Sequence, residues 1–207
     1  MIPNELQREA EWCVWKKELR SNGQITKIPY DPKTGRMAKS NDPSTFASYE
    51  YAYEIFETEG EYDGMGIRVS HGFAAIDIDH CYEDGTFSDI ASAIMDAVPS
   101  YTEFSPSGHG LRIIFRTDAE YNKQRYYVKN PNNNVEIYIS GATERFVTIT
   151  GNTLINAPVK TISSDELTDI CSRWMSRKQK SDKLTDEQII EKASASSKFV
   201  ALFRGDM

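Results

Sequence analysis

The chain has little that would tie it to a membrane or to an oxidising compartment. Its 207 residues include three cysteines, Cys13, Cys81 and Cys171, which lie far apart and form no Cys-x-x-Cys pair. A disulfide framework and a zinc finger are therefore not expected. No apolar run approaches the ~20 residues of a membrane-spanning helix. The N-terminal residues also lack the apolar core of a signal peptide. We expect a cytoplasmic protein without a membrane partner.

An excess of positive charge is also lacking, because the net charge is −7. The charges are nevertheless segregated: residues 16–39 contain seven basic and two acidic residues, whereas residues 40–100 contain thirteen acids and one base. Such a basic stretch can follow a phosphate backbone despite the overall charge. The candidates for contact with such a backbone are Lys27, Lys33, Arg36 and Lys39. The pattern fits a solvated surface equally well.

Hydrophobic periodicity predicts a mixture of strands and helices. Strands are predicted at 12–19, 25–30, 65–70, 72–79, 101–104, 111–116, 135–139 and 145–150. Helices are predicted at 41–57, 87–98, 164–178 and 185–195, with a polar loop at 123–134 and a polar linker at 177–183. We expect an α/β (α+β) fold with a mostly antiparallel central sheet, helices behind it and acids on its open face.

The expected core combines aromatic and aliphatic side chains. Its predicted members are Trp12, Trp15, Tyr49, Tyr53, Phe56, Ile76, Ile78, Ile113 and Ile137. The aromatic residues recur at helix or strand spacing, which favours a place in the core over stacking on nucleic-acid bases.

Two acids, Asp77 and Asp79, lie one residue apart in the apolar run 73–80. Alternate side chains of a strand share one face, so these two carboxylates are expected side by side. They repel each other unless a cation or a proton lies between them. The pair therefore predicts a divalent-metal site, although Asp-x-Asp alone also fits a strand that enters an acidic turn.

Glu136 is the single acid of another apolar strand, 135–139. Alternation turns Val135, Ile137 and Ile139 towards a core and Glu136 away from it. On a neighbouring strand, Glu136 would complete a three-carboxylate cluster able to hold two divalent ions for phosphoryl chemistry. A solvated residue on an open sheet face is the alternative.

The turn 105–112, Ser-Pro-Ser-Gly-His-Gly-Leu-Arg, is a candidate phosphate site. Its glycines, Gly108 among them, let backbone N–H groups approach an anion, and Ser105 and Ser107 add hydroxyl groups. Arg112 is expected to point away from the core and to offer a two-pronged donor for phosphate oxygens. His109 is a candidate donor or proton-transfer group. An ordinary hairpin explains the same residues.

Arg145 starts the strand predicted at 145–150. We expect this strand to run antiparallel to the Glu136 strand, which brings Arg145 near the acids. There it would bind a nucleotide phosphate or form an ion pair.

Taken in order, the segments resemble the catalytic domain of phage- and plasmid-type primase-polymerases, in the archaeo-eukaryotic primase superfamily. The resemblance covers about residues 10–155. It rests on the segments starting at Trp12 (WCVW), Thr26 (TKIPYDP), Asn41 (NDPSTF), Gly64 (GMGI), Ile76 (IDIDHC), Tyr101 (YTEFSPSG), Val135 (VEIY) and Arg145 (RFVTITG).

The resemblance implies a primase-like fold and a template-directed nucleotidyl transfer in phage or plasmid DNA replication. It implies that Asp77, Asp79 and Glu136 are catalytic and hold two Mg²⁺ or Mn²⁺ ions, with nucleoside triphosphates as substrates and single-stranded or primed DNA as template. The Ser-Gly turn of the family is followed by a basic residue, usually His, that contacts the nucleotide. Here that position is Arg112, which binds phosphate but does not exchange a proton near neutral pH. The extra residues 142–144 before Arg145 are a second departure.

In such proteins a helical segment and a helicase-like ATPase usually follow. We expect a catalytic domain at 1–158 and a helical segment at 159–207, with an apolar stripe at 199–203, leading into a longer replication protein. The chain has no Walker-type phosphate-binding motif, so that ATPase would lie elsewhere in the longer protein.

Two other functions remain open. One is a non-catalytic module that binds nucleic acid or a replication origin and retains the primase fold, as the Arg112 departure would suit. The other is a different phosphoryl enzyme built on Asp-x-Asp, such as a phosphatase or a glycosyltransferase, which leaves the ordered segments unexplained.

Overall fold

The computed structural model describes residues 1–143, 145–177, 190–191 and 194. The chain divides into two compact units, Met1–Ser176 and Arg177–Met207. The helix predicted at 185–195 lies largely outside the described residues, and the apolar stripe at 199–203 lies wholly outside them. No helix of the described part is long and apolar enough to cross a membrane.

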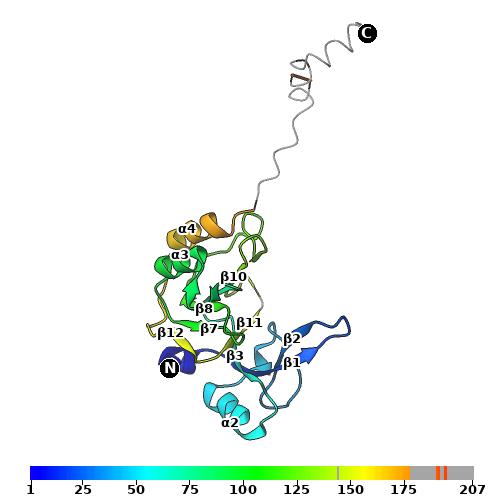
Figure 1. Ribbon diagram of the computed structural model, residues 1–207. Coiled ribbons are helices and arrows are strands. Elements are labelled where there is room, and N and C mark those ends of the chain that lie inside the picture. Colours follow the sequence, from blue (N-terminus) through cyan, green and yellow to red (C-terminus); the bar gives the residue numbers. More distant parts are fainter. Residues whose placement is uncertain (144, 178–189, 192–193, 195–207) are drawn as a thin grey trace, which may run out of the picture. The chain divides into compact units, whose positions relative to one another are not determined.

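Two antiparallel sheets form the frame of the first unit (Figure 1). The four-stranded sheet has the order β11-β3-β1-β2, with β11 (Phe146–Ile149), β3 (Gly64–Arg68), β1 (Trp12–Leu19) and β2 (Ile25–Tyr30). The six-stranded sheet has the order β12-β7-β8-β4-β10-β9, with β12 (Thr153–Ile155), β7 (Thr102–Phe104), β8 (Leu111–Arg116), β4 (Phe73–Ile78), β10 (Val135–Ile139) and β9 (Lys129–Asn130). A small hairpin joins β5 (Tyr82–Glu83) to β6 (Thr86–Phe87).

The predicted α+β class and antiparallel pairing are confirmed, but the single central sheet is not. The strands predicted on either side of His71 and Gly72 fall in different sheets, β3 in the smaller and β4 in the larger. His71 has a φ of 52° and Gly72 a φ of 77°. Two successive residues in the left-handed region turn the chain sharply, which directs it from one sheet into the other.

The helices are α1 (Asn4–Glu9), α2 (Tyr49–Glu59), α3 (Asp89–Ala97) and α4 (Ser164–Trp174). The helix predicted from residue 41 begins later than expected. The Asp42 side chain accepts a bond from the N–H of Ser44, but this caps only a 3-10 turn, η1 (Pro43–Thr45). Ser48 then caps α2 through the N–H of Tyr51. Two capping residues six positions apart therefore compete for one start, and the second begins the α-helix.

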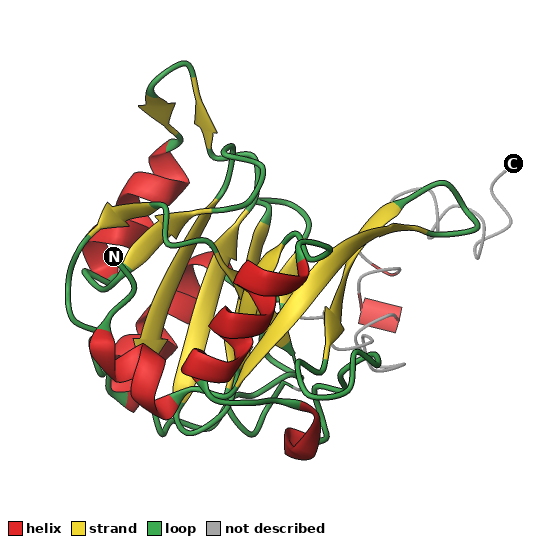
Figure 2. Ribbon diagram, turned by 90° about the horizontal axis from the view of Figure 1, so that it is seen from below, coloured by secondary structure: helices red, strands yellow, loops and turns green. Residues whose placement is uncertain are grey.

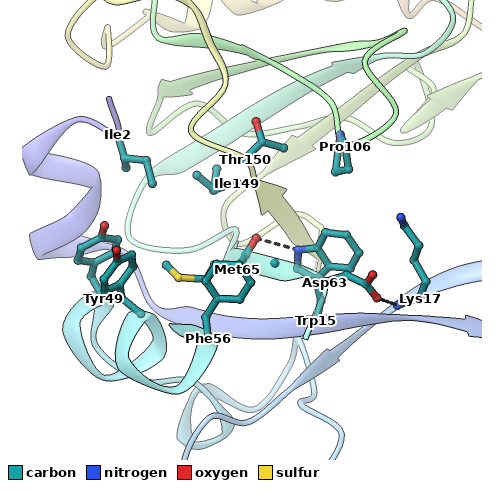
Figure 3. Close-up of a pocket in the computed structure, with 12 residues that line it drawn as sticks. Ile2, Trp15, Lys17, Tyr49, Phe56, Asp63, Met65, Pro106, Ile149 and Thr150 are labelled. Carbon is teal, nitrogen blue, oxygen red and sulfur yellow. Dashed lines mark hydrogen bonds between the residues drawn. The ribbon is translucent and has the colours of Figure 1, made fainter. Parts of the chain in front are cut away.

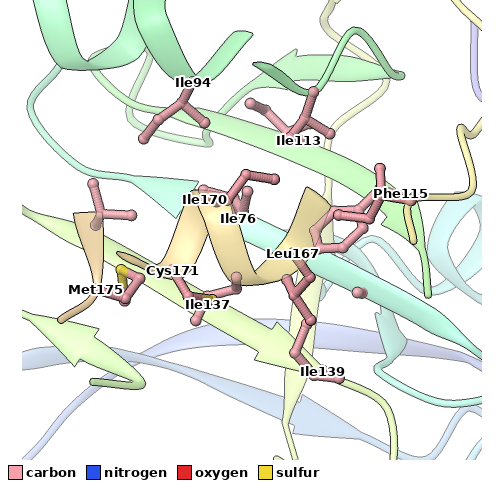
Figure 4. Close-up of a cluster of buried hydrophobic side chains, with 14 of the residues drawn as sticks. Ile76, Ile94, Ile113, Phe115, Ile137, Ile139, Leu167, Ile170, Cys171 and Met175 are labelled. Carbon is pink, nitrogen blue, oxygen red and sulfur yellow. The ribbon is translucent and has the colours of Figure 1, made fainter. Parts of the chain in front are cut away.

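Each face of the six-stranded sheet covers a separate apolar core. On one face Ile76, Ile113 and Ile137 pack with Ile94 of α3 and with Leu167 of α4 (Figure 4). On the other face, side chains of alternate positions meet the four-stranded sheet, α1 and α2. Figure 2 shows helices on both sides of the aligned strands. The helices expected behind the sheet are thus present, but the opposite face is largely covered rather than open.

Most of the predicted core residues are buried, and the aromatic residues of α2 are the exception. Trp12, Trp15, Ile76, Ile78, Ile113 and Ile137 are buried. Tyr49 and Phe56 are only partly buried, and Tyr53 is 45% exposed, so the core assignment of Tyr53 is wrong. The helical spacing correctly places the three rings on one side of α2, but their outer parts extend beyond the core.

Helix α4 belongs to the first compact unit because its apolar side packs on the sheet. A capping box fixes its start: the Ser163 hydroxyl accepts from the N–H of Glu166, and the Glu166 carboxylate accepts from the N–H of Ser163 at 2.8 Å. These bonds satisfy two backbone donors that a helix start leaves without partners.

We predict that Ser163→Ala lowers the free energy of unfolding by about 1 kcal/mol, the usual cost of losing a capping hydroxyl. Urea unfolding followed by circular dichroism measures the change. Ser164→Ala is the matched control, because it removes a neighbouring hydroxyl outside the capping box. Equal stability of the two variants would show that the cap does not hold α4.

Candidate active site

Five charged residues form one continuous row across the six-stranded sheet. Glu103 pairs with Arg112, Arg112 with Asp77, Asp77 with Glu136, and Glu136 with Lys129, each on the adjacent strand. Directly opposite residues on antiparallel strands have neighbouring side chains on the same face. The strand register therefore places two acids next to each other in the middle of the row, with a cation on either side of them.

Arg112 is the buried cation of this row, between Glu103 and Asp77. Its guanidinium group donates to Asp77 Oδ2 at 2.7 Å, and to the carbonyl oxygen and hydroxyl of Thr148 in β11. Burial alone lowers the pKa of Arg112, but the charges of Asp77 and Glu103 raise it above its ordinary value. Arg112 does leave the helix-covered face as predicted. It does not reach solvent, however, because β11 of the other sheet covers it.

Asp77 retains one carboxylate oxygen without a bond. Oδ2 accepts from Arg112, whereas Oδ1 is buried and has no hydrogen-bond partner. A buried carboxylate oxygen without a partner is costly and is normally matched by a donor or a cation. The Oδ1 atom is therefore a position at which a bound cation would be stabilising.

Glu136 lies directly beside Asp77, because β10 pairs with β4 in that register. One of its oxygens accepts from the Lys129 ammonium group and the other from the Tyr138 hydroxyl. The burial of alternate residues in β10 confirms that Val135, Ile137 and Ile139 face the core and that Glu136 faces away.

Asp79 follows the end of β4, and its backbone N–H donates to the carbonyl oxygen of Asn134 at 2.9 Å. Burial raises the pKa of Asp79, and the negative charges of Asp77 and Glu136 raise it further. The three predicted carboxylates therefore interact electrostatically. In the described residues, however, no three His, Cys, Asp or Glu side chains already form a metal cage. Arg112 and Lys129 engage Asp77 and Glu136 instead.

The turn 105–110 is fastened to the end of the Asp77 strand. The Ser105 hydroxyl accepts from the N–H of Gly110 at 3.2 Å and lies 3.0 Å from the Ser107 hydroxyl. The backbone N–H of Cys81 donates to the carbonyl oxygen of His109 at 2.8 Å. A Cβ on Gly110 would lie 2.8 Å from the carbonyl oxygen of Ile78, so only glycine permits this close approach.

The candidate nucleotide-binding residues of this turn therefore lie beside the residues that follow Ile78. Gly108 has a φ of 77°, which a glycine adopts without strain. The His109 side chain is exposed, with Nδ1 3.4 Å from the carbonyl oxygen of Tyr82. Binding of a nucleotide by these residues stays a prediction.

Arg145 does not lie where its expected strand pairing would put it. Strand β11 pairs with β3 of the smaller sheet, not with β10, and Arg145 is exposed just before β11. Its charge still acts on Tyr138, the hydrogen-bond partner of Glu136. Arg145 is therefore near the row, but on the covering sheet.

The four candidate contacts with a nucleic-acid template are in three different environments. Lys27 in β2 is half-buried, and burial together with the charge of Arg112 lowers its pKa, while Asp77 and Asp79 act in the opposite direction. Lys33 donates to the carbonyl oxygens of Ser44 and Phe46, at 2.5 and 2.7 Å, and so holds its own loop. The last two, Arg36 and Lys39, are exposed. The structure brings Lys27 alone of these four close to the row.

Glu103 is the member of the row that the sequence analysis did not single out. Its carboxylate is fully buried and accepts from the N–H groups of Thr150 and Gly151, at 2.8 and 3.0 Å, and from the Tyr101 hydroxyl at 2.9 Å. Burial raises the pKa of Glu103, against the effect of these donors and of Arg112. A single acid inside the strand 101–104 is the signal that could have identified it, as it did for Glu136.

The fold and the charged row define an α+β protein whose candidate site is a set of carboxylates and cations on one face of an antiparallel sheet. No family model matches the chain. Over 155 residues the chain is 34% identical to a protein named DNA primase-polymerase from Nitratiruptor phage NrS-1. The chain is therefore related to the DNA primase-polymerases, as its ordered segments predict. The match covers 70% of this chain and 20% of that relative.

We predict that Glu103→Gln destabilises the protein by about 1–3 kcal/mol, because the new amide group would face the buried N–H of Thr150 with another donor. Chemical unfolding measures the loss. Glu83→Gln is the matched control, since Glu83 is exposed in the β5–β6 hairpin. If both variants unfold at the same denaturant concentration as wild type, the bonds from Thr150 and Gly151 to Glu103 do not stabilise the fold.

Proposed function

We propose that this chain is the catalytic part of a DNA primase or DNA polymerase that performs template-directed nucleotidyl transfer. The proposal is supported by the relationship to a named primase-polymerase and by the carboxylates that the strand register sets side by side. The substrates are nucleoside triphosphates and a single-stranded or primed DNA template, in phage or plasmid replication. Because the chain spans about a fifth of its relative, a helicase-like ATPase elsewhere in a longer protein is part of the proposal.

The observation that carries the proposal is the state of Asp77. Its Oδ1 atom is buried without a partner, while its neighbours Asp79 and Glu136 add negative charge around it. Such a position fits a divalent cation better than any neutral donor, because Mg²⁺ and Mn²⁺ prefer carboxylate oxygens. The residues present therefore suit the Mg²⁺ or Mn²⁺ that the resemblance implies.

Asp77, Asp79 and Glu136 would hold two such ions in the proposed enzyme. When bound, divalent ions activate an attacking 3′ oxygen and neutralise the leaving pyrophosphate. The chain's own residues orient the reactants. Arg112 fixes the Asp77 carboxylate through one oxygen and leaves the other available.

The turn 105–110 would bind the triphosphate in this proposal. The Ser105 and Ser107 hydroxyls and the backbone around Gly108 are donors beside the strand end that carries Asp79. His109 is exposed and therefore accessible to a phosphate. Arg112, being buried, would act mainly by positioning Asp77, which gives it a role different from that of an exposed phosphate-binding histidine.

Asp79→Asn is the sharpest single test of this function. We predict a loss of at least about 100-fold in nucleotide incorporation, since even groups that only orient a metal ligand account for 10–100-fold. The free energy of unfolding should stay equal or rise, because the charge of Asp79 is disfavoured by burial and by two neighbouring acids. Incorporation of labelled nucleotides on a primed template with Mg²⁺ or Mn²⁺ is measured beside thermal unfolding.

Asp84→Asn is the matched control, because Asp84 is exposed at a hairpin turn where its φ of 48° suits Asn. Asp77→Asn is less informative, because it also breaks the buried pair with Arg112. Wild-type protein that binds template but incorporates no nucleotide would instead favour the non-catalytic nucleic-acid-binding or origin-binding module. Equal incorporation by Asp79→Asn and wild type would contradict the proposed site.

Lys129 provides a second test, because it holds one Glu136 oxygen that a divalent ion would need. The Lys129 side chain is 66% exposed and that of Glu136 is 12% exposed, so water screens this ion pair from the lysine side and a metal ion can displace Lys129. We predict that Lys129→Met binds Mn²⁺ up to about fivefold more tightly. Isothermal titration calorimetry measures the affinity, with Lys123→Met as control. Weaker binding by Lys129→Met would show that Lys129 does not compete with the ion.

A further inference from the structure

Helix α2 and strands β1 and β3 form an aromatic pocket of about 320 Å³ that the charged row does not include (Figure 3). Trp15 and Met65 lie on the strand side of the pocket, while Tyr49 and Phe56 point into it from the helix. The volume is at the lower end of the range for sites that bind small molecules.

The rings of the pocket are arranged for stacking rather than for filling a core. Tyr49 and Tyr53 stack with centroids 5.8 Å apart and an interplanar angle of 25°. Tyr49 in turn meets the buried Trp12 edge-on at 4.9 Å. The inner end of this series is therefore fixed, while its outer ring, Tyr53, is 45% exposed. A fixed aromatic series with one exposed ring can accept another flat ring at little entropic cost.

Trp15 is held in a definite orientation on the other side of the pocket. Its indole N–H donates to the carbonyl oxygen of Met65 at 2.9 Å. A Cβ at Gly64 would lie 3.0 Å from the indole ring, so glycine allows Trp15 to lie close against β3. The hydrogen bond to Met65 and the contact with Gly64 both leave the outer faces of the Tyr53 and Phe56 rings uncovered.

Positive charge lies beside the aromatic pocket. Lys17 lines it and is directly opposite Lys27 in the β1–β2 pair. The Lys27 ammonium group is 5.8 Å from the centre of the Trp15 ring, and its pKa responds to the charges of Asp77 and Asp79. Lys27 therefore lies between the aromatic pocket and the charged row. Both lysines belong to the basic segment 16–39.

The pocket also touches two segments of the candidate active site. Pro106, from the turn 105–110, and Thr150, whose N–H is held by Glu103, both line it. A polymer that carries both phosphates and flat rings, and that runs along the two lysines, would thus contact the charged row and the aromatic pocket at the same time. Single-stranded nucleic acid has this chemistry, since phosphates pair with lysines and bases stack on aromatic rings.

We infer that the aromatic pocket binds one unpaired base of the DNA strand whose phosphates contact Lys17 and Lys27. The inference rests on the proposed function for the presence of a DNA strand, but it assigns a different site. The base stacks on the Tyr53 ring, and the lysines hold the adjoining phosphates. The ligand class is therefore a nucleobase in a single strand, not a free nucleotide.

The test compares two tyrosines of α2 that have almost the same exposure. Tyr53, 45% exposed, lines the pocket, whereas Tyr51, 42% exposed, does not. For wild-type protein and each variant, fluorescence anisotropy measures the binding of two labelled chains of equal length: an oligothymidylate and an abasic deoxyribose-phosphate chain.

We expect Tyr53→Ala to weaken oligothymidylate binding about fivefold or more, while binding of the abasic chain stays unchanged. Tyr51→Ala should change neither, and Tyr53→Phe should retain wild-type affinity.

Three results would overturn the inference: equal effects of Tyr51→Ala and Tyr53→Ala, equal loss for both chains, or weakened binding of free thymidine triphosphate alone. The Asp79→Asn activity assay separates this outcome from failure of the proposed function. If Tyr53→Ala does not change strand binding but Asp79→Asn abolishes incorporation, the base site is wrong and the proposed nucleotidyl transfer stands. If Tyr53→Ala weakens binding only of the chain with bases, and wild-type protein incorporates no nucleotide, the base site stands and the proposed function is wrong.

Discussion

The buried ion pair between Arg112 and Asp77 is the interaction on which the rest of the site depends. Arg112 joins the two sheets, because the same guanidinium group binds Asp77 in the larger sheet and Thr148 in the smaller one. Removing one partner of a buried pair leaves the other charge without compensation, which typically costs about 3–5 kcal/mol. The bonds from Arg112 to Thr148 therefore hold the two sheets together, while the charge of Arg112 offsets that of Asp77 beside Glu136.

The two cations of the row have different physical roles because their exposure differs. Arg112 is buried, always charged and bonded to both sheets, so it acts as a permanent structural cation. Lys129 lies at the edge of the sheet on a flexible, exposed side chain. Lys129 can leave Glu136 and be replaced there by another cation, such as a metal ion. Of the two cations of the row, Lys129 beside Glu136 is therefore the exchangeable one, and Arg112 beside Asp77 is the permanent one.

Sequence periodicity predicted the faces of the strands well, because a period of two follows from backbone geometry alone. It correctly placed Glu136 opposite the core residues of β10, and it turned Arg112 away from the helices. It did not reveal which strand covers that face, since strand pairing between distant segments is set by tertiary packing. The wrong partner for Arg145 and the unexpected burial of Arg112 both follow from this one gap. Glu103, in contrast, could have been identified as the single acid of its strand.

The charged row also constrains the fold itself. A shift of one residue in any of its strands would turn the charges into the helix-covered core and move isoleucines to the other face. Ile76 and Ile113 would then leave the core that they form with α3 and α4, and Asp77 would lose Arg112. The register that brings the acids together is thus the register that fills the core. The chemistry-bearing face could only be the one opposite α3 and α4, and the strand that covers it, β11, reaches the charged row through Thr148. The same segment reaches the aromatic pocket through Thr150, so one covering strand connects both sites.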